Sequence, residues 1–207
     1  MILKKFEFSD VFAANCYFYI DEKSKHGFIV DPSAHADILL QFIDEQQWHI
    51  EKIFLTHSHL DHIGAVLPLA QALQIKYYGL NMAQKYLSNP NFATHFTNHA
   101  VLENMTYCQD GDEISLSSNK DIVLKVLATP GHTLDSAVYY DKANNIAFTG
   151  DTIFQSGIGR TDIEGSGGNP QQLMHSIKTK ILTLPDCTIL YPGHGEATTV
   201  KQEKHML

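Results

Sequence analysis

Thr-His-Ser-His-Leu-Asp-His, residues 56–62, is the stretch on which the fold and the chemistry of this chain depend. It follows the apolar run 53–55, and residues 52–56 together predict a short buried strand. Residues 63–73 have the apolar spacing of a helix. We therefore expect the stretch to lie in a turn between strand and helix, where its side chains can converge.

Four side chains of this stretch belong to metal-binding types. His57 and His59 are two residues apart, so they point the same way in an extended chain. Asp61 and His62 are adjacent, so they can address a second point nearby as the chain turns. Imidazole nitrogen combined with carboxylate oxygen suits zinc or iron, and the lack of thiolate here argues against a structural zinc cluster.

The composition narrows the class of protein. A length of 207 residues predicts one domain, residues 1–207. The formal charge of −8 stays negative even with two divalent cations bound, which argues against a nucleic-acid partner. The three cysteines are odd in number and far apart, as in a reduced cytosolic protein. We find no signal-peptide pattern and no apolar run long enough to cross a membrane, so we expect a cytoplasmic protein with no membrane partner.

Periodicity and turn residues divide the rest of the chain. We expect helices at 36–47 and 169–182, the second opened by Asn169 and Pro170. Short helices and loop are expected at 81–104, and a helical turn after 198. The further predicted strands are 2–8, 16–21, 27–31, 76–79, 122–127, 135–141, 146–149 and 188–191. Strand groups separated by helices predict an α/β fold of two mixed sheets packed face to face, with helices outside.

Three more polar residues follow predicted strands directly. His132 comes after Thr-Pro-Gly (129–131), Asp151 after Thr-Gly (149–150), and His194 lies within Pro-Gly-His-Gly (192–195). In each case a glycine lets the backbone turn sharply, so that one side chain projects into a pocket. Since α/β folds place their chemistry at strand ends, we expect these residues to meet the 56–62 stretch.

These four motifs, in this order, resemble the metallo-β-lactamase superfamily from the first strands to residue 195. The resemblance implies an αββα sandwich with a site for two divalent metal ions between its sheets. It implies zinc first, with iron or manganese as alternatives. Carried over, one metal would be held by His57, His59 and His132. The other would be held by Asp61, His62 and His194, with Asp151 bridging; Asp61 and Asp151 would also be catalytic, because their carboxylates donate charge.

Within the superfamily the chain is most similar to a short glyoxalase II, a hydroxyacylglutathione hydrolase. The stretches 151–154 and 157–160 resemble loops of that family, which implies a small thioester substrate and attack by a metal-activated hydroxide. Common β-lactamases have cysteine where Asp151 stands, and flavodiiron proteins have glutamate at the position of His59. Full-length glyoxalase II has a C-terminal helical domain that helps hold glutathione, whereas this sequence ends shortly after His194. An aromatic residue of the family is replaced here by Asp162.

Other interpretations stay open beside this one. Gly-Arg-Thr-Asp (159–162) also resembles persulfide dioxygenases, which use a single iron on the same fold, but those have Pro-Ala-His-Asp where this chain has 192–195. A metal sensor and a nuclease are weaker alternatives.

Two hypotheses exist for Arg160: it binds a substrate carboxylate, or it forms a local ion pair with Asp162. The sequence predicts no oligomeric state. It also predicts no role for the other histidines, which are His26, His35, His49, His95, His99, His175 and His205. Among them His175 is a weak candidate for orienting a metal-binding side chain.

Overall fold

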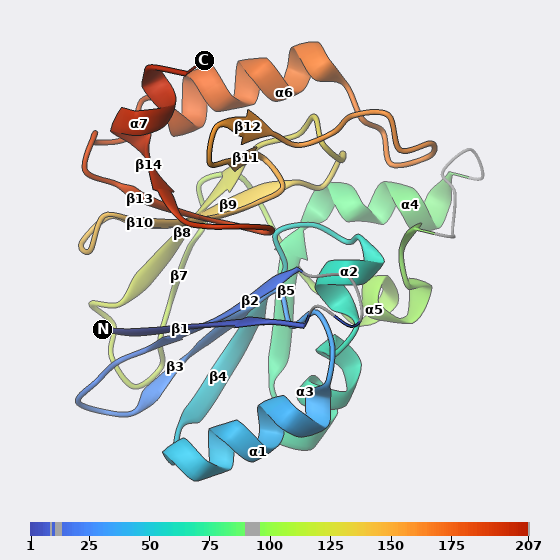
Figure 1. Cartoon of the computed structure of the whole chain (residues 1–207). Helices are drawn as coiled ribbons and strands as arrows, with labels where there is room; N and C mark the ends of the chain where they lie inside the picture. Colours follow the sequence, from blue (N-terminus) through green and yellow to red (C-terminus); the bar gives the residue numbers. More distant parts are fainter. Residues whose placement is uncertain (9, 11–13, 90–95, 207) are drawn as a thin grey trace.

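Two six-stranded sheets packed face to face, with helices on both outer faces, make up the protein (Figure 1). The computed structural model describes residues 1–8, 10, 14–89 and 96–206. This arrangement is the αββα sandwich predicted from the sequence, and both sheets are mixed, as expected.

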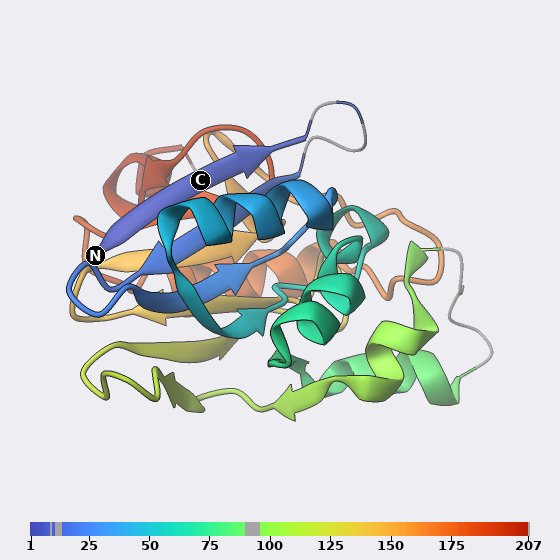
Figure 2. The ribbon, with the colours of Figure 1, turned by 90° about the horizontal axis from the view of Figure 1, so that it is seen from below.

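The first sheet comes from the N-terminal half of the chain. Its strand order follows the sequence: β1 (Ile2–Glu7), β2 (Asn15–Ile20), β3 (His26–Val30), β4 (His49–Phe54), β5 (Lys76–Leu80) and β6 (Thr106–Cys108). The first three strands are antiparallel, and β3 to β6 are parallel. Parallel neighbours need crossover connections, and here α1 (Ala36–Gln46), then α2 (Leu60–Ile63) with α3 (Val66–Leu73), provide them; Figure 2 shows α1 and α3 lying across this sheet.

The second sheet comes from the C-terminal half. Its order is β14 (Thr198–Thr199), β13 (Ile189–Pro192), β10 (Ile146–Gly150), β9 (Ala137–Asp141), β8 (Val123–Ala128) and β7 (Glu113–Ser115). Only β10 and β13 are parallel, and α6 (Pro170–Ser176) connects them. The Asn169 side chain caps α6 by accepting from the Gln172 amide, as predicted, and the helix continues as a π-helical segment, Ile177–Ile181.

Strand β2 shows how the layers are held together. All six of its residues are buried, and they alternate between two faces. Cys16, Phe18 and Ile20 pack under the helices of the first sheet, whereas Tyr17 and Tyr19 point into the core between the sheets. A third apolar cluster joins the second sheet to α6. After Asn15 the strand has only cysteine, isoleucine and aromatic residues, because both of its faces are covered.

Several predicted boundaries were wrong. The strand expected at 52–56 is β4, which starts at His49 and ends at Phe54. The helix expected at 63–73 starts at Leu60 and is interrupted after Ile63, because the Ala65 amide donates to the Pro32 carbonyl (2.9 Å) instead of continuing the helix.

Short elements were also missed, among them the hairpin of β11 (Ile153–Phe154) and β12 (Gly157–Ile158). The stretch 81–104 contains the expected short helices, namely Asn81–Ala83, α4 (Gln84–Ser88) and α5 (His99–Asn104). Residues 90–95, with His95, lie outside the described residues. The tail forms α7 (Val200–Lys204). Within the described ranges, no helix has the length and apolar character needed to cross a membrane.

Candidate metal centre

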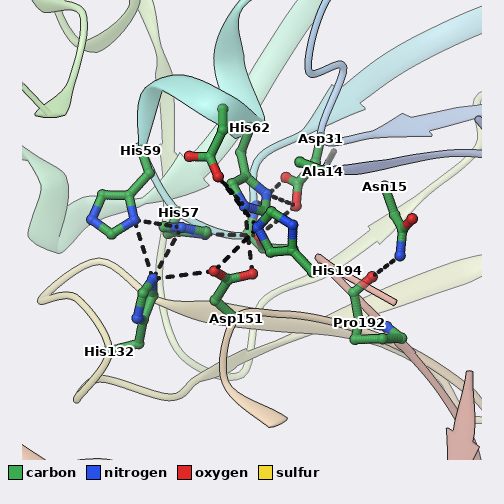
Figure 3. A network of polar contacts seen from close by, with 12 residues as sticks. Ala14, Asn15, Asp31, His57, His59, His62, His132, Asp151, Pro192 and His194 are labelled. Atoms are coloured by element: carbon green, nitrogen blue, oxygen red, sulfur yellow. Dashed lines mark hydrogen bonds and ion pairs between the residues drawn. The ribbon is translucent and has the colours of Figure 1, made fainter. Parts of the chain in front are cut away.

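The seven residues expected at a metal site all meet at one edge of the two sheets. Figure 3 labels all of them except Asp61. His57 and His59 follow β4, and Asp61 and His62 lie in the first turn of α2. The others follow three strands of the second sheet: His132 after β8, Asp151 after β10 and His194 after β13. The structure therefore brings together every predicted ligand, although their role in binding a metal stays a prediction.

Three imidazoles form what we call the trihistidine group, His57, His59 and His132. Their facing nitrogens lie 3.0 Å apart for His57 Nε2 and His59 Nδ1, 3.1 Å for His132 Nε2 and His59 Nδ1, and 3.3 Å for the two Nε2 atoms of His57 and His132. Ligand nitrogens about 2.0–2.1 Å from a tetrahedral zinc ion would be about 3.3 Å from one another. The spacing of these nitrogens is thus close to that of a zinc site.

Asp61, His62 and His194 form a second set, the mixed group. Asp61 Oδ2 lies 3.2 Å from His194 Nε2 and 3.6 Å from His62 Nε2. Asp151 stands between the two groups. Its Oδ1 is 3.4 Å from His62 Nε2, and its Oδ2 is 3.5 Å from His132 Nε2 and 3.6 Å from His194 Nε2. A carboxylate in this position can contact ions in both groups.

The two groups have opposite electrostatics. Burial, followed by repulsion among the neighbouring imidazoles, lowers the pKa of His57 well below its usual value and that of His59 to about 3. Burial alone would also lower the pKa of His62, but Asp151, Asp31 and Asp61 outweigh it and raise this pKa to about 9. The trihistidine group therefore holds neutral imidazoles, the form that binds metal. The mixed group favours positive charge beside its carboxylates.

Asp31, at the end of β3, orients ligands in both groups and was not among the predicted site residues. Its Oδ2 accepts hydrogen bonds from His62 Nδ1 (2.9 Å) and from the Thr56 hydroxyl (2.5 Å), which in turn lies 3.1 Å from His57 Nδ1. Its Oδ1 accepts from the Thr56 amide (2.7 Å). With Nδ1 occupied in this way, Nε2 of His57 and of His62 faces the centre. An aspartate directly after a strand was the available signal.

The ring of His132 is oriented by a main-chain atom. His132 Nδ1 donates to the carbonyl oxygen of Arg160 (2.6 Å). This contact fixes the ring so that Nε2 faces the other imidazoles. It uses a main-chain atom, so no side chain in the sequence could have pointed to it. His175 has no such role, because it lies exposed on α6.

A buried clamp holds the loop that carries His194 (Figure 3). The Asn15 side chain, 0% exposed, donates to the carbonyl oxygens of Pro192 (3.0 Å) and Gly195 (2.9 Å). The backbone N–H of Asn15 donates to the carbonyl oxygen of Gly193 (2.6 Å). The Tyr17 hydroxyl also donates to Pro192 (2.7 Å). Strand β2 of the first sheet thereby positions a ligand of the second sheet.

Glycines in the motifs are required for two different reasons. Gly150 has a φ of 48°, so the predicted sharp turn before Asp151 is present. Gly193 has no such conformation. It is needed because a Cβ there would collide with Asp151 Oδ1 and with the His62 ring. In Pro-Gly-His-Gly the sharp turn predicted for a glycine is at Gly195, with a φ of 76°, whereas Gly193 allows close approach.

The residues present fit divalent cations. Among the described residues, His62 Nε2 and Asp151 Oδ1 are buried atoms without a hydrogen-bond partner, and both face the centre. Buried polar atoms rarely stay unpaired. Nitrogen and carboxylate oxygen ligands in two sets of three, with one carboxylate between them, are a suitable donor set for two such ions.

A cavity of about 680 Å³ opens over the centre. Besides five of the seven residues above, it is lined by Leu60, Phe96, Phe154, Ile158, Arg160 and Ile163. Arg160 therefore lies at the cavity, as the hypothesis of substrate binding requires. It also forms the ion pair that the other required, with Nε and Nη2 at 2.7 and 3.1 Å from the Asp162 carboxylate.

Comparison with known sequences identifies the class of protein. The metallo-beta-lactamase superfamily matches residues 9–194 of this chain. The chain thus belongs to the metallo-beta-lactamase superfamily, whose members bind divalent metals, and it has the fold of that superfamily.

Individual relatives cover nearly the whole chain. The hydroxyacylglutathione hydrolase GloC of Haemophilus influenzae is 37% identical over 198 residues, which is 93% of this chain and 91% of that protein. The crystal structure of the BLEG-1 B3 metallo-beta-lactamase has a TM-score of 0.83 at 30% identity, covering 99% of this chain and 97% of that one. The structure of ETHE1 from Myxococcus xanthus has a TM-score of 0.79 at 32% identity, covering 100% and 83%.

Proposed function

We propose that this protein is a metal-dependent thioester hydrolase of the glyoxalase II kind, acting on thioesters such as S-lactoylglutathione. The observation that carries the proposal is the convergence of two three-residue ligand sets with Asp151 between them. The similarity to a hydroxyacylglutathione hydrolase over more than nine-tenths of both chains supports it. Zinc is the proposed metal, with iron or manganese as alternatives, because the donor set is nitrogen and oxygen without thiolate.

Each residue has a distinct part in this proposal. His57, His59 and His132 would hold one cation, Asp61, His62 and His194 the other, and Asp151 would bridge them. Two divalent cations held there would lower the pKa of a shared water toward about 7 and polarise the substrate carbonyl. Asp61 and Asp151 supply the negative charge that balances the cations. Asp31, Thr56 and the Arg160 carbonyl keep the imidazoles in the binding orientation.

Arg160 is the proposed substrate-binding residue at the cavity rim. A guanidinium can bind a carboxylate through two parallel hydrogen bonds, and Arg160 makes such a pair with Asp162. A substrate carboxylate would have to replace Asp162, so the net contribution of Arg160 to binding is expected to be small.

A mononuclear iron persulfide dioxygenase on the same fold is the second candidate. The similarity to ETHE1 and the 159–162 loop favour it. The full set of seven ligand residues, including Asp61 and His194 in contact at 3.2 Å, favours two metals and hence the hydrolase.

One experiment separates the two candidates. The protein is loaded with zinc, iron or manganese, its metal content is measured, and S-lactoylglutathione hydrolysis is followed without oxygen. We expect two metal ions per chain and oxygen-independent hydrolysis. A single iron per chain, with oxygen consumed alongside glutathione persulfide, would replace the proposal with the dioxygenase.

A further inference from the structure

The wall of the cavity above the centre is apolar. Apart from the histidines and aspartates of the centre, five of its six lining side chains are Leu60, Phe96, Phe154, Ile158 and Ile163. Two of the aromatic rings stand directly beside predicted ligands. The Phe96 ring meets His59 edge to face at 5.6 Å, and the Phe154 ring lies 6.3 Å from His194. Any group extending from the centre into the cavity therefore contacts hydrocarbon on both sides.

This wall is built into the fold. In the β11–β12 hairpin, Ile153 is fully buried against α6, and its neighbour Phe154 points the other way, toward the cavity. The turn of the hairpin is tied to the C-terminal helix, because the Ser156 amide donates to the buried carboxylate of Glu203 (3.0 Å). Phe154 and Ile158 are thus held in place before any ligand arrives.

Lysine and arginine side chains are scarce in the cavity. Arg160 is the only lysine or arginine among the described lining residues, and the undescribed residues include neither type. Its guanidinium already donates two hydrogen bonds, from Nε and Nη2, to the carboxylate of Asp162. The chain as a whole carries a formal charge of −8. A ligand that depends on its carboxylates, as glutathione would, finds little here to pair with them.

We propose, on the basis of the hydrolase function above, that this cavity selects thioesters by an apolar aliphatic or aromatic arm and not by the carboxylates of the thiol. Burying one methylene group on such a wall corresponds to about a fourfold gain in affinity. Specificity therefore grows with the length of the apolar arm until the cavity is filled.

The test uses the metal-loaded protein and a matched series of substrates. S-Propanoyl, S-butanoyl and S-hexanoyl glutathione differ in apolar length but have similar intrinsic reactivity, and uncatalysed hydrolysis is subtracted. We expect kcat/KM to rise about fourfold per methylene. Replacing glutathione by uncharged N-acetylcysteamine, with the acyl group kept, should lower kcat/KM by less than a few-fold. A flat series, or a large loss on removing the carboxylates, would overturn the inference.

Variants of the wall connect the effect to these residues. Phe154→Ala should flatten the chain-length series, whereas Leu87→Ala, at an exposed apolar position on α4 outside the cavity, should leave it unchanged. Ile158→Lys introduces a cation into the wall and should shift preference toward glutathione thioesters. If Phe154→Ala and Leu87→Ala behave alike, the wall does not select the substrate.

A binding measurement distinguishes failure of this inference from failure of the proposed function. S-Hexylglutathione and S-methylglutathione are thioethers that cannot be hydrolysed, and calorimetry gives their affinities directly. Tighter binding of the hexyl compound, lost in Phe154→Ala, supports the apolar selection even if no thioester is turned over. Equal affinities would overturn the inference even if thioesters are hydrolysed.

Discussion

The trihistidine group and the mixed group lie side by side but are built differently. The three imidazoles of the first are 1–6% exposed and have lowered pKa values. In the second, His62 is fully buried, but the side chains of Asp61 and His194 are 24% and 33% exposed. The pKa of His194 is raised, first by its hydrogen bond to Asp61. The imidazoles of the first group are almost fully buried, and the second group has two partly exposed side chains at the cavity.

The difference follows from where the ligands originate. The trihistidine residues lie in the loops that follow β4 and β8, where their side chains are almost fully buried. The mixed group uses the helix α2 and the loop after β13, which is held through Asn15. Ligands on loops need added contacts to stay in place. The two halves of the centre should therefore respond unequally to mutation, although Asp151 contacts both.

The largest effect is expected from Asp151→Asn, because this side chain links the two groups. Losing the charge between the groups should lower kcat by several powers of ten while the fold survives. Steady-state kinetics and circular dichroism are the measurements, with the surface variant Asp121→Asn as the control. Near-normal kcat in a folded, metal-loaded Asp151→Asn protein would show that the groups do not act as one centre.

Asp31→Asn should have the next largest effect. Asparagine tolerates the φ of 48° at this position, but its amide can donate to His62 Nδ1 and leave the proton on Nε2, the nitrogen that faces the centre. We expect a loss of about 10–100-fold in metal affinity, larger at the mixed group than at the trihistidine group. Titration with zinc against a competing chelator measures both.

The matched control for that variant is Asp141→Asn. Asp141 is also a buried carboxylate, bonded to the Tyr19 hydroxyl at 2.7 Å. It should lose stability without losing metal affinity. Equal losses of metal in both variants would mean that Asp31 acts only through general stability.

Asn15→Ala should affect the mixed group alone. Removing the Asn15 side-chain amide takes one donor from the buried Pro192 carbonyl, which keeps the Tyr17 hydroxyl, and one from the exposed Gly195 carbonyl, so it should cost about 1–2 kcal/mol of unfolding free energy. Tyr17→Phe removes a single bond to the same loop and should cost about 1 kcal/mol. Metal content at limiting zinc should fall toward one ion per chain in Asn15→Ala. Parallel loss from both groups would contradict the independence of the two halves.

The smallest effect is expected from Arg160→Ala. Its carbonyl still orients His132, so the trihistidine group should be unchanged. Its exposed guanidinium is already paired, so KM for glutathione thioesters should rise only a few-fold, with kcat little altered. Thioesters without carboxylates should not respond. Equal kinetic losses on charged and uncharged substrates, with a lower melting temperature, would exclude Arg160 as a substrate ligand.

The sequence by itself was enough to predict the αββα sandwich and to place seven residues in the turns that follow strands. The aromatic and β-branched composition of β2 and the apolar spacing of α1 are local properties, and glycine beside a polar residue marks the end of a strand. Boundaries of helices such as α2 were less predictable, because a contact with Pro32 decides where that helix breaks. The single-domain organisation, like the metal-binding role of each ligand, stays a prediction.

What the tertiary structure decided is which of these strand ends meet, and what stands behind and above them. Asp31 reaches His62 across 31 positions of sequence, and Asn15 reaches Pro192 across 177. No spacing rule connects residues so far apart, because their contact depends on which strands become neighbours. The same holds for the apolar wall, where Phe96 and Phe154 come from different segments. Local sequence pattern determines which types of metal-binding residue are present. The packing of the two sheets determines how those residues are oriented and which substrate the cavity can admit.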